Sequence, residues 1–313
     1  MSRVRFVLPV AAAFTAMLAL GVGCGSSDST ETPEATAGTT PQVAGSRATP
    51  QATAADASPQ ATAAGGSPVG VIALGHSGLT GYASDPNRPE GDARENSWAT
   101  GTSPEVNSVY RRLVAVRPEN EGHVANLAED GSGAGRLVTQ AQEALRQVPA
   151  PALVIIQTID NDIRCDGNDD ANVSVFGELV AEALQVITEA SPDSKILIVS
   201  SLGRPAQFAE VAATDPTLKR ANTGTGMCDF FNESGDLVEE NVAALTAIVE
   251  SYEAEQERVC GSVPQCSTDG GAFATYQDSL EDLVPGDWHL TVHGHARVAE
   301  LIWPTVAALL GLS

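Results

Sequence analysis

The stretch VGVIALGHSGLTG, Val69 to Gly81, decides the fold of this chain. Its apolar run Val71–Leu74 leads directly into glycines, a pattern typical of a short buried strand followed by a turn. Open α/β sheets bind their ligands at the carboxyl ends of such strands. Ser77 lies on this turn among small residues that let a substrate approach the backbone. Its hydroxyl either faces a cleft or only caps the next element, and the turn alone leaves both interpretations open.

From Val69 onward, apolar segments alternate with amphipathic ones, which predicts an α/β protein. Strands joined through helices imply crossovers and a parallel sheet, so we expect one three-layer α/β/α domain over residues 69–313, of the flavodoxin-like kind. The pattern predicts strands at 69–75, 123–128, 151–158 and 195–201, and a fifth somewhere between Cys260 and Tyr276. It predicts helices at 104–116, 135–148, 173–190, 237–259 and 294–310.

Residues 1–24 predict an export signal of the lipoprotein type. Two arginines precede an apolar run that ends in small residues and Cys24. This pattern resembles a bacterial lipoprotein cleavage site, at which Cys24 would carry the lipid. One departure is that Gly21 stands three residues before the cysteine, where leucine is usual. The alternatives are an ordinary signal peptide or an uncleaved anchor. We expect an exported, lipid-anchored protein on the outer side of the bacterial cell membrane.

Residues 25–68 predict a flexible linker, because they are mostly Ala, Thr, Ser, Pro and Gly and cannot bury enough apolar surface to offset the entropy of ordering. The whole chain has 40 acidic and 17 basic residues and a formal net charge of −23. Such a charge disfavours binding to nucleic-acid phosphates or to an anionic membrane surface. We therefore expect no nucleic-acid partner, membrane contact through the lipid alone, and a monomer.

The chain has five cysteines. If Cys24 carries lipid, the four that remain favour two disulfides over a metal site, because the protein is exported and the CxxC spacing of zinc sites is absent. Cys260 and Cys266 close a short loop, so we pair them and leave Cys165 with Cys228. Four cysteines permit three pairings, so this pairing is a preference.

Three further stretches carry polar groups near predicted strand ends or before the last helix. They are NLAEDGSGAG (126–135), TIDNDI (158–163) and GDWHLTVHGHARVAELIW (286–303). Ester hydrolysis by a serine needs a base, a carboxylate that orients the base, and hydrogen-bond donors for the oxyanion. His289 is the candidate base and Asp287 the candidate carboxylate. The candidate donors are the backbone amides of Ser77 and Gly131 and the side chain of Asn161.

These stretches, in this order, resemble the SGNH (GDSL-type) serine hydrolase family over residues 69–310. Gly75-His76-Ser77 stands where the family has glycine, aspartate and the nucleophilic serine. The segment 126–131 matches the second block, which ends at the oxyanion glycine. Ile159-Asp160-Asn161-Asp162 stands for the third block, normally glycine, any residue, asparagine and aspartate. His289 lies five residues before Gly294, the family's spacing between its catalytic histidine and the terminal helix.

The resemblance implies an esterase or lipase-like hydrolase that forms an acyl-serine intermediate on Ser77, with His289 as base. It implies no metal and no organic cofactor. The substrate would be a small-molecule, lipid or glycan ester, and the sequence does not choose among short-chain esters, acetylated glycans, lysophospholipids and thioesters.

The chain departs from the family pattern at two places. His76 replaces the aspartate of the first block, so the hydrogen bonding around that turn must differ. Gly286 stands three residues before the histidine, where the family has its orienting aspartate, and Asp287 stands two before. Asp287 is our candidate for the orienting group, with Asp282 or a backbone carbonyl as alternatives. These departures are the support for an alternative class, an inactive surface binding protein with the same fold.

Other features have plainer interpretations. His293 and His295 are rivals of His289, and only the spacing to Gly294 selects among them. The run GSGAG resembles a dinucleotide fingerprint but does not follow the first strand. The acidic stretch 160–170 fails the calcium-loop pattern. We expect residues 95–110 to lie near the nucleophile turn and the substrate cleft, with Trp98 either a packing residue or a platform.

Overall fold

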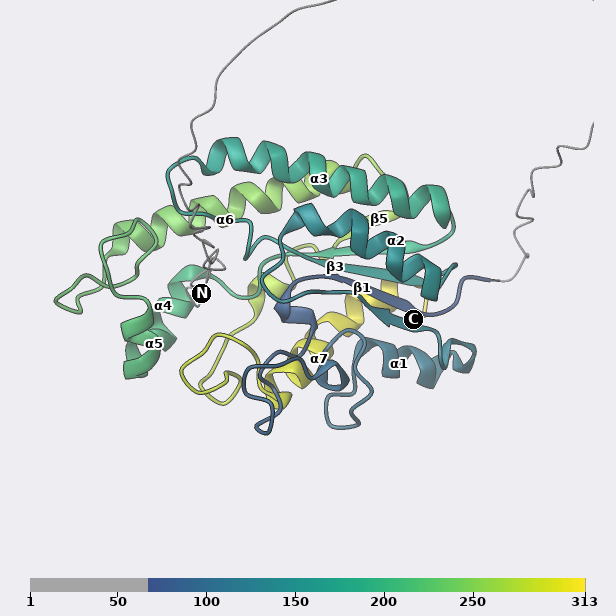
Figure 1. The fold of residues 1–313 in the computed structure, drawn as a ribbon, viewed down its shortest axis with the longest axis horizontal. Helices are drawn as coiled ribbons and strands as arrows, with labels where there is room; N and C mark the ends of the chain where they lie inside the picture. The colour runs from purple at the N-terminus through teal and green to yellow at the C-terminus, as the bar shows by residue number, and fades with distance from the viewer. Residues whose placement is uncertain (1–66, 313) are drawn as a thin grey trace, which may run out of the picture. The chain divides into compact units, whose positions relative to one another are not determined.

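A computed structural model describes residues 67–312 of the chain (Figure 1). The predicted leader that ends at Cys24 and nearly all of the predicted linker lie outside the described residues. Within the described part, none of the helices combines the length and apolar character needed to cross a membrane.

A sheet of five parallel strands forms the centre of the domain. The strands are β1 (Val71–Gly75), β2 (Val124–Asn126), β3 (Leu153–Gln157), β4 (Lys195–Val199) and β5 (Cys266–Thr268). Their order in the sheet is β2-β1-β3-β4-β5, and every neighbouring pair is parallel. The four strands whose positions the sequence predicted are confirmed, with shorter bounds. The fifth lies within the interval predicted for it. Val71 pairs with Leu153 and Gly75 with Gln157, so β1 and β3 end at one edge.

Helices cover both faces of the sheet. They include α1 (Val109–Val116), α2 (Leu137–Gln147), α3 (Asp169–Ala190), α6 (Glu239–Cys260) and α7 (Val292–Leu309). Ile72 and Leu74 of β1 lie in an apolar cluster with residues of α2 and α3, whereas Val71 and Ala73 lie in a second cluster with residues of α1 and α7. Figure 1 shows α2, α3 and α6 on one side of the sheet and α1 and α7 on the other. This arrangement confirms the predicted three-layer α/β/α architecture.

The starts of two helices differ from the predicted residue by four or five positions, whereas the other three agree within two. The helix predicted from residue 104 begins at Val109, because Ser108 Oγ accepts the N–H of Arg111 at 3.2 Å and caps the helix there. The helix predicted from residue 173 begins at Asp169, so that two aspartates occupy its first turn. Acidic side chains are favourable at that end because the helix dipole is positive there.

Two helices were not predicted. They are α4 (Pro205–Thr214) and α5 (Pro216–Ala221). Each has proline in its first turn, and Asp215 caps α5 by accepting two backbone N–H groups at 2.8 Å. An aspartate followed by proline is a helix-start signal, so the sequence contained a cue for α5 that its weak apolar periodicity obscured.

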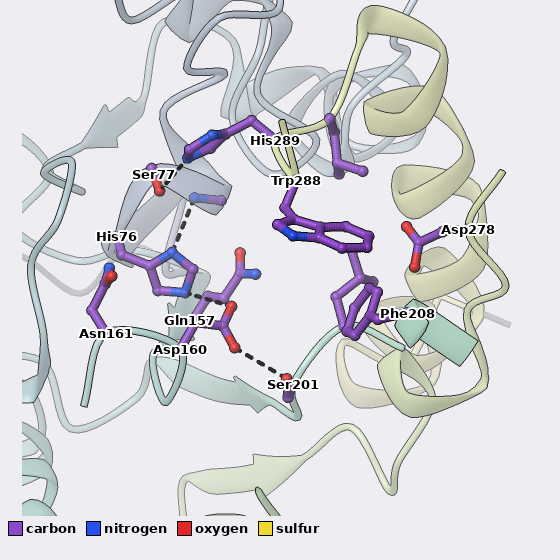
Figure 2. Close-up of a pocket in the computed structure, with 13 residues that line it drawn as sticks. His76, Ser77, Gln157, Asp160, Asn161, Ser201, Phe208, Asp278, Trp288 and His289 are labelled. Carbon is purple, nitrogen blue, oxygen red and sulfur yellow. Dashed lines mark hydrogen bonds and ion pairs between the residues drawn. The ribbon is translucent and has the colours of Figure 1, made fainter. Parts of the chain in front are cut away.

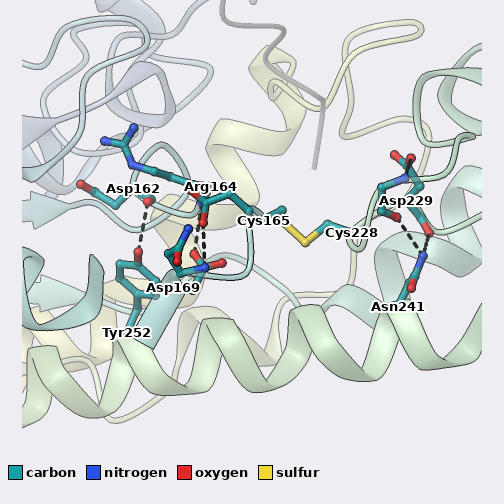
Figure 3. Close-up of a disulfide and its surroundings, with 11 residues drawn as sticks. Asp162, Arg164, Cys165, Asp169, Cys228, Asp229, Asn241 and Tyr252 are labelled. Atoms are coloured by element: carbon teal, nitrogen blue, oxygen red, sulfur yellow. Dashed lines mark hydrogen bonds between the residues drawn. A yellow bond between two sulfur atoms is a disulfide. The ribbon is translucent and has the colours of Figure 1, made fainter. Parts of the chain in front are cut away.

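Two disulfides join the four cysteines of the described residues in the pairing preferred from the sequence, Cys165 with Cys228 and Cys260 with Cys266. The first connects the loop that follows β3 to the segment that precedes α6 (Figure 3). The same loop is held a second time, because Tyr252 of α6 donates its hydroxyl to the carbonyl of Asp162 at 3.1 Å. The loop after β3 is therefore held both by the disulfide and by α6.

Candidate active site

The turn after β1 carries Ser77. Gly75 ends the strand with a φ of +137°, and a Cβ there would lie 1.8 Å from the carbonyl oxygen of Gln157. Only glycine fits where the end of β1 approaches the backbone of β3 this closely. A single turn of 3-10 helix, η1 (Ser77–Leu79), follows, and His76 caps it by accepting the Gly78 N–H on Nδ1 at 3.1 Å. The serine hydroxyl is thereby presented at the carboxyl edge of the sheet, as the sequence predicts.

His289 meets Ser77 from the other end of the chain. It lies just before α7, and its Nε2 is 2.9 Å from Ser77 Oγ. Its Nδ1 is 2.7 Å from Asp287 Oδ1, and its backbone N–H donates to the same oxygen at 3.1 Å. The ring of Tyr82 packs against the imidazole with a centroid distance of 4.6 Å. A carboxylate on Nδ1 favours the tautomer with its proton there, which leaves Nε2 free to accept from the serine.

A tight turn places Asp287 despite its shifted position in the sequence. The N–H of Asp287 donates to the carbonyl of Val284 at 2.9 Å, and the N–H of Val284 donates to the carbonyl of His289 at 2.8 Å. Gly286 has a φ of +75° in this turn, a conformation that a residue with a side chain rarely adopts. The glycine found where the family has aspartate therefore makes the turn that brings the next residue to the imidazole.

The electrostatics of Asp287 match this contact. Partial burial by itself raises the pKa of the Asp287 carboxyl. The hydrogen bonds and the charge of His289 act in the opposite direction and bring the pKa below its ordinary value. The carboxyl group is accordingly ionised at neutral pH.

The alternatives to these two residues lie elsewhere. Asp282 is fully buried and contacts His293 Nδ1 at 2.9 Å and the guanidinium of Arg297. It also accepts from the backbone and hydroxyl of Ser279, so its oxygens are engaged away from His289. His295 is 1 % exposed inside the core. The geometry thus selects His289 and Asp287 from the candidates.

Asn161 lies on the turn that follows β3. Ile159, at the position of the family's glycine, has a φ of +85°, so a β-branched residue here adopts the backbone that glycine favours. The Asn161 side chain is nearly buried and donates Nδ2 to the carbonyl of Ser132 at 3.1 Å. This bond joins the loop after β3 to the loop after β2. Ser77 and Asn161 line one cavity, whereas Gly131 is not among its lining residues.

The cavity has a volume of about 110 Å³ and opens beside Ser77 (Figure 2). Its lining comes from the turns after β1, β3 and β4, from α4 and from the segments around Asp278 and Trp288. Five polar or aromatic residues of the lining were not predicted from the sequence. They are Gln157, Ser201, Phe208, Asp278 and Trp288. Gln157 and Ser201 could have been predicted from their places at strand ends, and Trp288 from its place beside His289. Phe208 and Asp278 carry no such signal in the sequence.

Residues 95–110 do not line this cavity, contrary to expectation. Trp98 is fully buried and packs edge-on against Phe273 with a centroid distance of 5.1 Å. Its indole N–H donates to Gln157 Oε1 at 3.3 Å. Trp98 is therefore a core residue, and its hydrogen bond holds Gln157, which lines the cavity.

His76 is 4 % exposed and faces the loop after β3. Its Nε2 lies 3.4 Å from Asp160 Oδ2, and Asp160 Oδ1 accepts the hydroxyl of Ser201 at 3.0 Å. Burial is the largest influence on the His76 pKa and lowers it, while the charge of Asp160 acts in the opposite direction. A neutral imidazole accepts from Gly78 on Nδ1 and carries its proton on Nε2, which faces Asp160 but makes no hydrogen bond within the described residues.

The fold and the site together define a hydrolase of the SGNH type, and the comparisons agree. Residues 62–302 match the family model described as GDSL-like Lipase/Acylhydrolase, and the chain belongs to this family. The protein is accordingly an ester-bond hydrolase. No curated protein matches the chain.

Several solved structures are similar to the chain. An extracellular lipase from Streptomyces rimosus is 16% identical, with 77% of this chain and 99% of that chain covered and a TM-score of 0.46. A phospholipase A1 from Streptomyces albidoflavus is 12% identical, with the same coverage of 77% and 99% and a TM-score of 0.46. A lipase from a goat rumen metagenome is 14% identical, with 77% and 97% covered and a TM-score of 0.48.

Proposed function

We propose that the protein hydrolyses carboxylic esters through an acyl-enzyme on Ser77. The observation that carries this proposal is the continuous contact from Ser77 Oγ to His289 Nε2 at 2.9 Å and from His289 Nδ1 to Asp287 at 2.7 Å. A nucleophile within hydrogen-bonding reach of a base, which a third group orients, is the arrangement that activates a serine.

In the first half of the reaction, Ser77 Oγ bonds to the acyl carbon while its proton passes to His289 Nε2. Asp287 stabilises the imidazolium that results. The tetrahedral intermediate collapses, the ester C–O bond breaks, and His289 gives its proton to the departing alcohol oxygen. In the second half, water attacks the acyl-serine with His289 again as base. The products are a free acid, an alcohol and the regenerated Ser77.

The oxyanion donors in this proposal are the amides of Ser77 and Gly131 and the side chain of Asn161. Asn161 has two N–H groups on Nδ2 and gives one of them to Ser132 at 3.1 Å. The second remains available to the oxyanion, and the first fixes the direction in which it points. A donor fixed before the reaction contributes most, because it needs no reorganisation in the transition state.

Covalent labelling tests the proposal directly. The full-length protein in mild detergent is treated with a fluorophosphonate probe and digested, and the labelled peptide is mapped. We expect label on Ser77 and none in the Ser77→Ala variant, while Ser201→Ala, which removes another serine of the same cavity, still labels. If folded protein takes up no label, the serine is not activated, and the competing class of surface binding protein is favoured instead.

We also propose that the protein is a lipoprotein anchored through Cys24 and displayed outside the cytoplasm. The support is the sequence of residues 1–24 and the two disulfides, which form in oxidising compartments. Cys24→Ser or treatment with globomycin should leave a protein of precursor size. A Cys165→Ser variant serves as the control for loss of a cysteine as such. If Cys24→Ser partitions with membranes at the mature size, the assignment of Cys24 fails.

A further inference from the structure

The wall of the cavity opposite Ser77 is aromatic and polar at once. Phe208 and Trp288 meet there edge to face, with a centroid distance of 5.2 Å. Figure 2 shows Trp288 projecting into the cavity between the catalytic pair and Phe208, with Asp278 beyond them. Asp160 and Ser201 form the side nearest the loop after β3. The cavity therefore combines ring faces with polar groups.

Two polar atoms of this wall lack partners. Trp288 Nε1, a donor, and Asp278 Oδ2, an acceptor, are both inaccessible to solvent, and neither makes a hydrogen bond within the described residues 67–312. Asp278 itself is only 8 % exposed. Buried polar groups in native proteins nearly always have hydrogen-bond partners, because an unpaired one loses its solvation without compensation. Because both atoms are enclosed, they reach a ligand only when the Trp288 and Asp278 side chains turn toward the cavity, and a ligand that supplies both an acceptor and a donor then resolves the two deficits together.

The charge of the wall narrows the chemistry of that ligand. Two aspartates line the cavity, and no lysine or arginine does. Burial raises the pKa of Asp278 to about 7, so an anionic headgroup such as a phosphodiester would meet the Asp160 carboxylate and a partly ionised Asp278, with no basic side chain in the lining. A quaternary ammonium group would suit the carboxylates and the rings but would leave the indole N–H of Trp288 unpaired. Hydroxyl groups donate and accept, so a polyhydroxylated ring suits the carboxylate, the indole N–H and the aromatic faces.

We propose that the cavity binds the sugar of an acylated carbohydrate and that Trp288 and Asp278 determine this specificity. The indole N–H donates to one sugar hydroxyl, Asp278 Oδ2 pairs with another, and the ring faces of Trp288 and Phe208 pack against the C–H surface of the sugar. The ester bond then lies toward Ser77. This inference rests on the proposed serine hydrolase and names its substrate class.

A pair of matched esters tests the inference. Glucose 6-acetate and cyclohexylmethyl acetate share a six-membered ring and an acetyl group, but only the first carries hydroxyls. We expect kcat/KM to favour the sugar ester by roughly ten- to a hundredfold, because a site built to bond hydroxyls rejects the analogue that lacks them. Trp288→Phe keeps a ring but removes the N–H, and Asp278→Asn keeps the shape but removes the carboxyl group. Each should reduce the preference at least roughly fivefold.

The controls separate specificity from folding and from the reaction itself. Trp303→Phe, on α7 and outside the cavity lining, should keep the wild-type preference. Fluorophosphonate labelling of Ser77 in each variant shows whether the catalytic pair is intact. Labelled wild type that cleaves both esters equally overturns the sugar site but leaves the proposed function standing. A preference for acetylcholine over both esters overturns it in favour of a cation site.

A binding measurement keeps the inference testable without turnover. The full-length Ser77→Ala protein is titrated with glucose 6-acetate in a calorimeter, alone and combined with Asp278→Asn. Saturable binding that weakens at least roughly tenfold in the double variant supports the sugar site. Absence of binding by Ser77→Ala protein with a normal unfolding transition contradicts it. Absence of labelling in the wild type contradicts the proposed function, whichever result the calorimeter gives.

Discussion

The imidazole Nδ1 of His76 accepts the backbone N–H of Gly78 at 3.1 Å and thereby caps the turn that carries Ser77. The family places an aspartate at this position, and a carboxylate is also an acceptor suited to capping. The histidine therefore supplies the same kind of hydrogen bond with a neutral group. Burial lowers the pKa of His76 and favours the neutral form, and an aspartate at this position would instead place a second carboxylate beside Asp160, which stands 3.4 Å from His76 Nε2.

His76→Ala removes the acceptor and should destabilise the protein by about 1 kcal/mol, the usual cost of losing a cap. His76→Asn retains a neutral acceptor and should recover most of that loss. The free energy of unfolding in urea measures the stability, and the rate of fluorophosphonate labelling measures the position of Ser77. Equal behaviour of the two variants in both measurements would show that the cap does not position the serine.

Substitution of Asp287 should impair catalysis, whereas substitution of Asp282 should impair stability. Asp287→Asn removes the charge beside His289 and should reduce kcat by on the order of a thousandfold or more, with little change in unfolding. Asp282→Asn removes the buried carboxylate that pairs with Arg297 and should lower the unfolding temperature instead. Steady-state kinetics and thermal unfolding of both variants distinguish the roles. A larger kcat loss for folded Asp282→Asn would reverse the assignment.

Asn161→Ala should reduce kcat by on the order of a hundredfold, the typical cost of one oxyanion donor. KM should change less, because the donor acts mainly on the charge that develops in the transition state. Asn87→Ala, on the exposed loop after η1, is the matched control and should retain wild-type kinetics. A near-normal kcat for Asn161→Ala would remove Asn161 from the oxyanion site.

His295 should make stability depend on pH. Burial, with a smaller influence from His289, lowers the His295 pKa to about 3. An unfolded chain binds this proton near the ordinary histidine value of about 6.5, so between those values the unfolded state holds more protons than the folded state. Stability should therefore fall as the pH falls through this window, by up to about 1.4 kcal/mol per pH unit from this group. Above the window the contribution is constant.

The comparison of the wild type with His295→Gln isolates that contribution. Urea unfolding at several pH values between 4 and 7.5 should give a shallower pH dependence for the variant, whatever its stability at neutral pH. Parallel curves for the two proteins would show that His295 takes up its proton equally in both states.

The two disulfides should differ in their contribution to stability. Cys165–Cys228 spans a sequence separation of 63 residues, against 6 for Cys260–Cys266. Loop-closure entropy then predicts stabilisation of about 4 kcal/mol for the first and about 2 kcal/mol for the second. Unfolding of the Cys165→Ser/Cys228→Ser and Cys260→Ser/Cys266→Ser proteins measures both. A larger loss in the second protein would contradict the entropic account.

The sequence predicted the sheet, and the edge of the sheet at which Ser77 and Asn161 both lie, for a physical reason. Short apolar runs identify buried strands, and the turns after parallel strands must share one edge, so Ser77 and Asn161 could be placed together before any coordinates. Asp287 was harder to select, because its contact with His289 depends on a turn at Gly286 that no periodicity encodes. Phe208 could not be predicted at all, since α4 was missed. Asp278 lies in an irregular segment whose position only tertiary packing determines.

Ser77 and His289 are separated by 212 residues, with the serine on the first strand and the histidine just before the last helix. A chain that is synthesised or exported from its N-terminus thus presents the nucleophile long before the base exists beside it. A chain that ends before His289 cannot hold the pair together. In the proposed reaction, hydrolysis therefore begins only after the segment that carries His289 has folded against the turn after β1, so catalytic competence reports that the chain has been made and folded at least as far as this histidine.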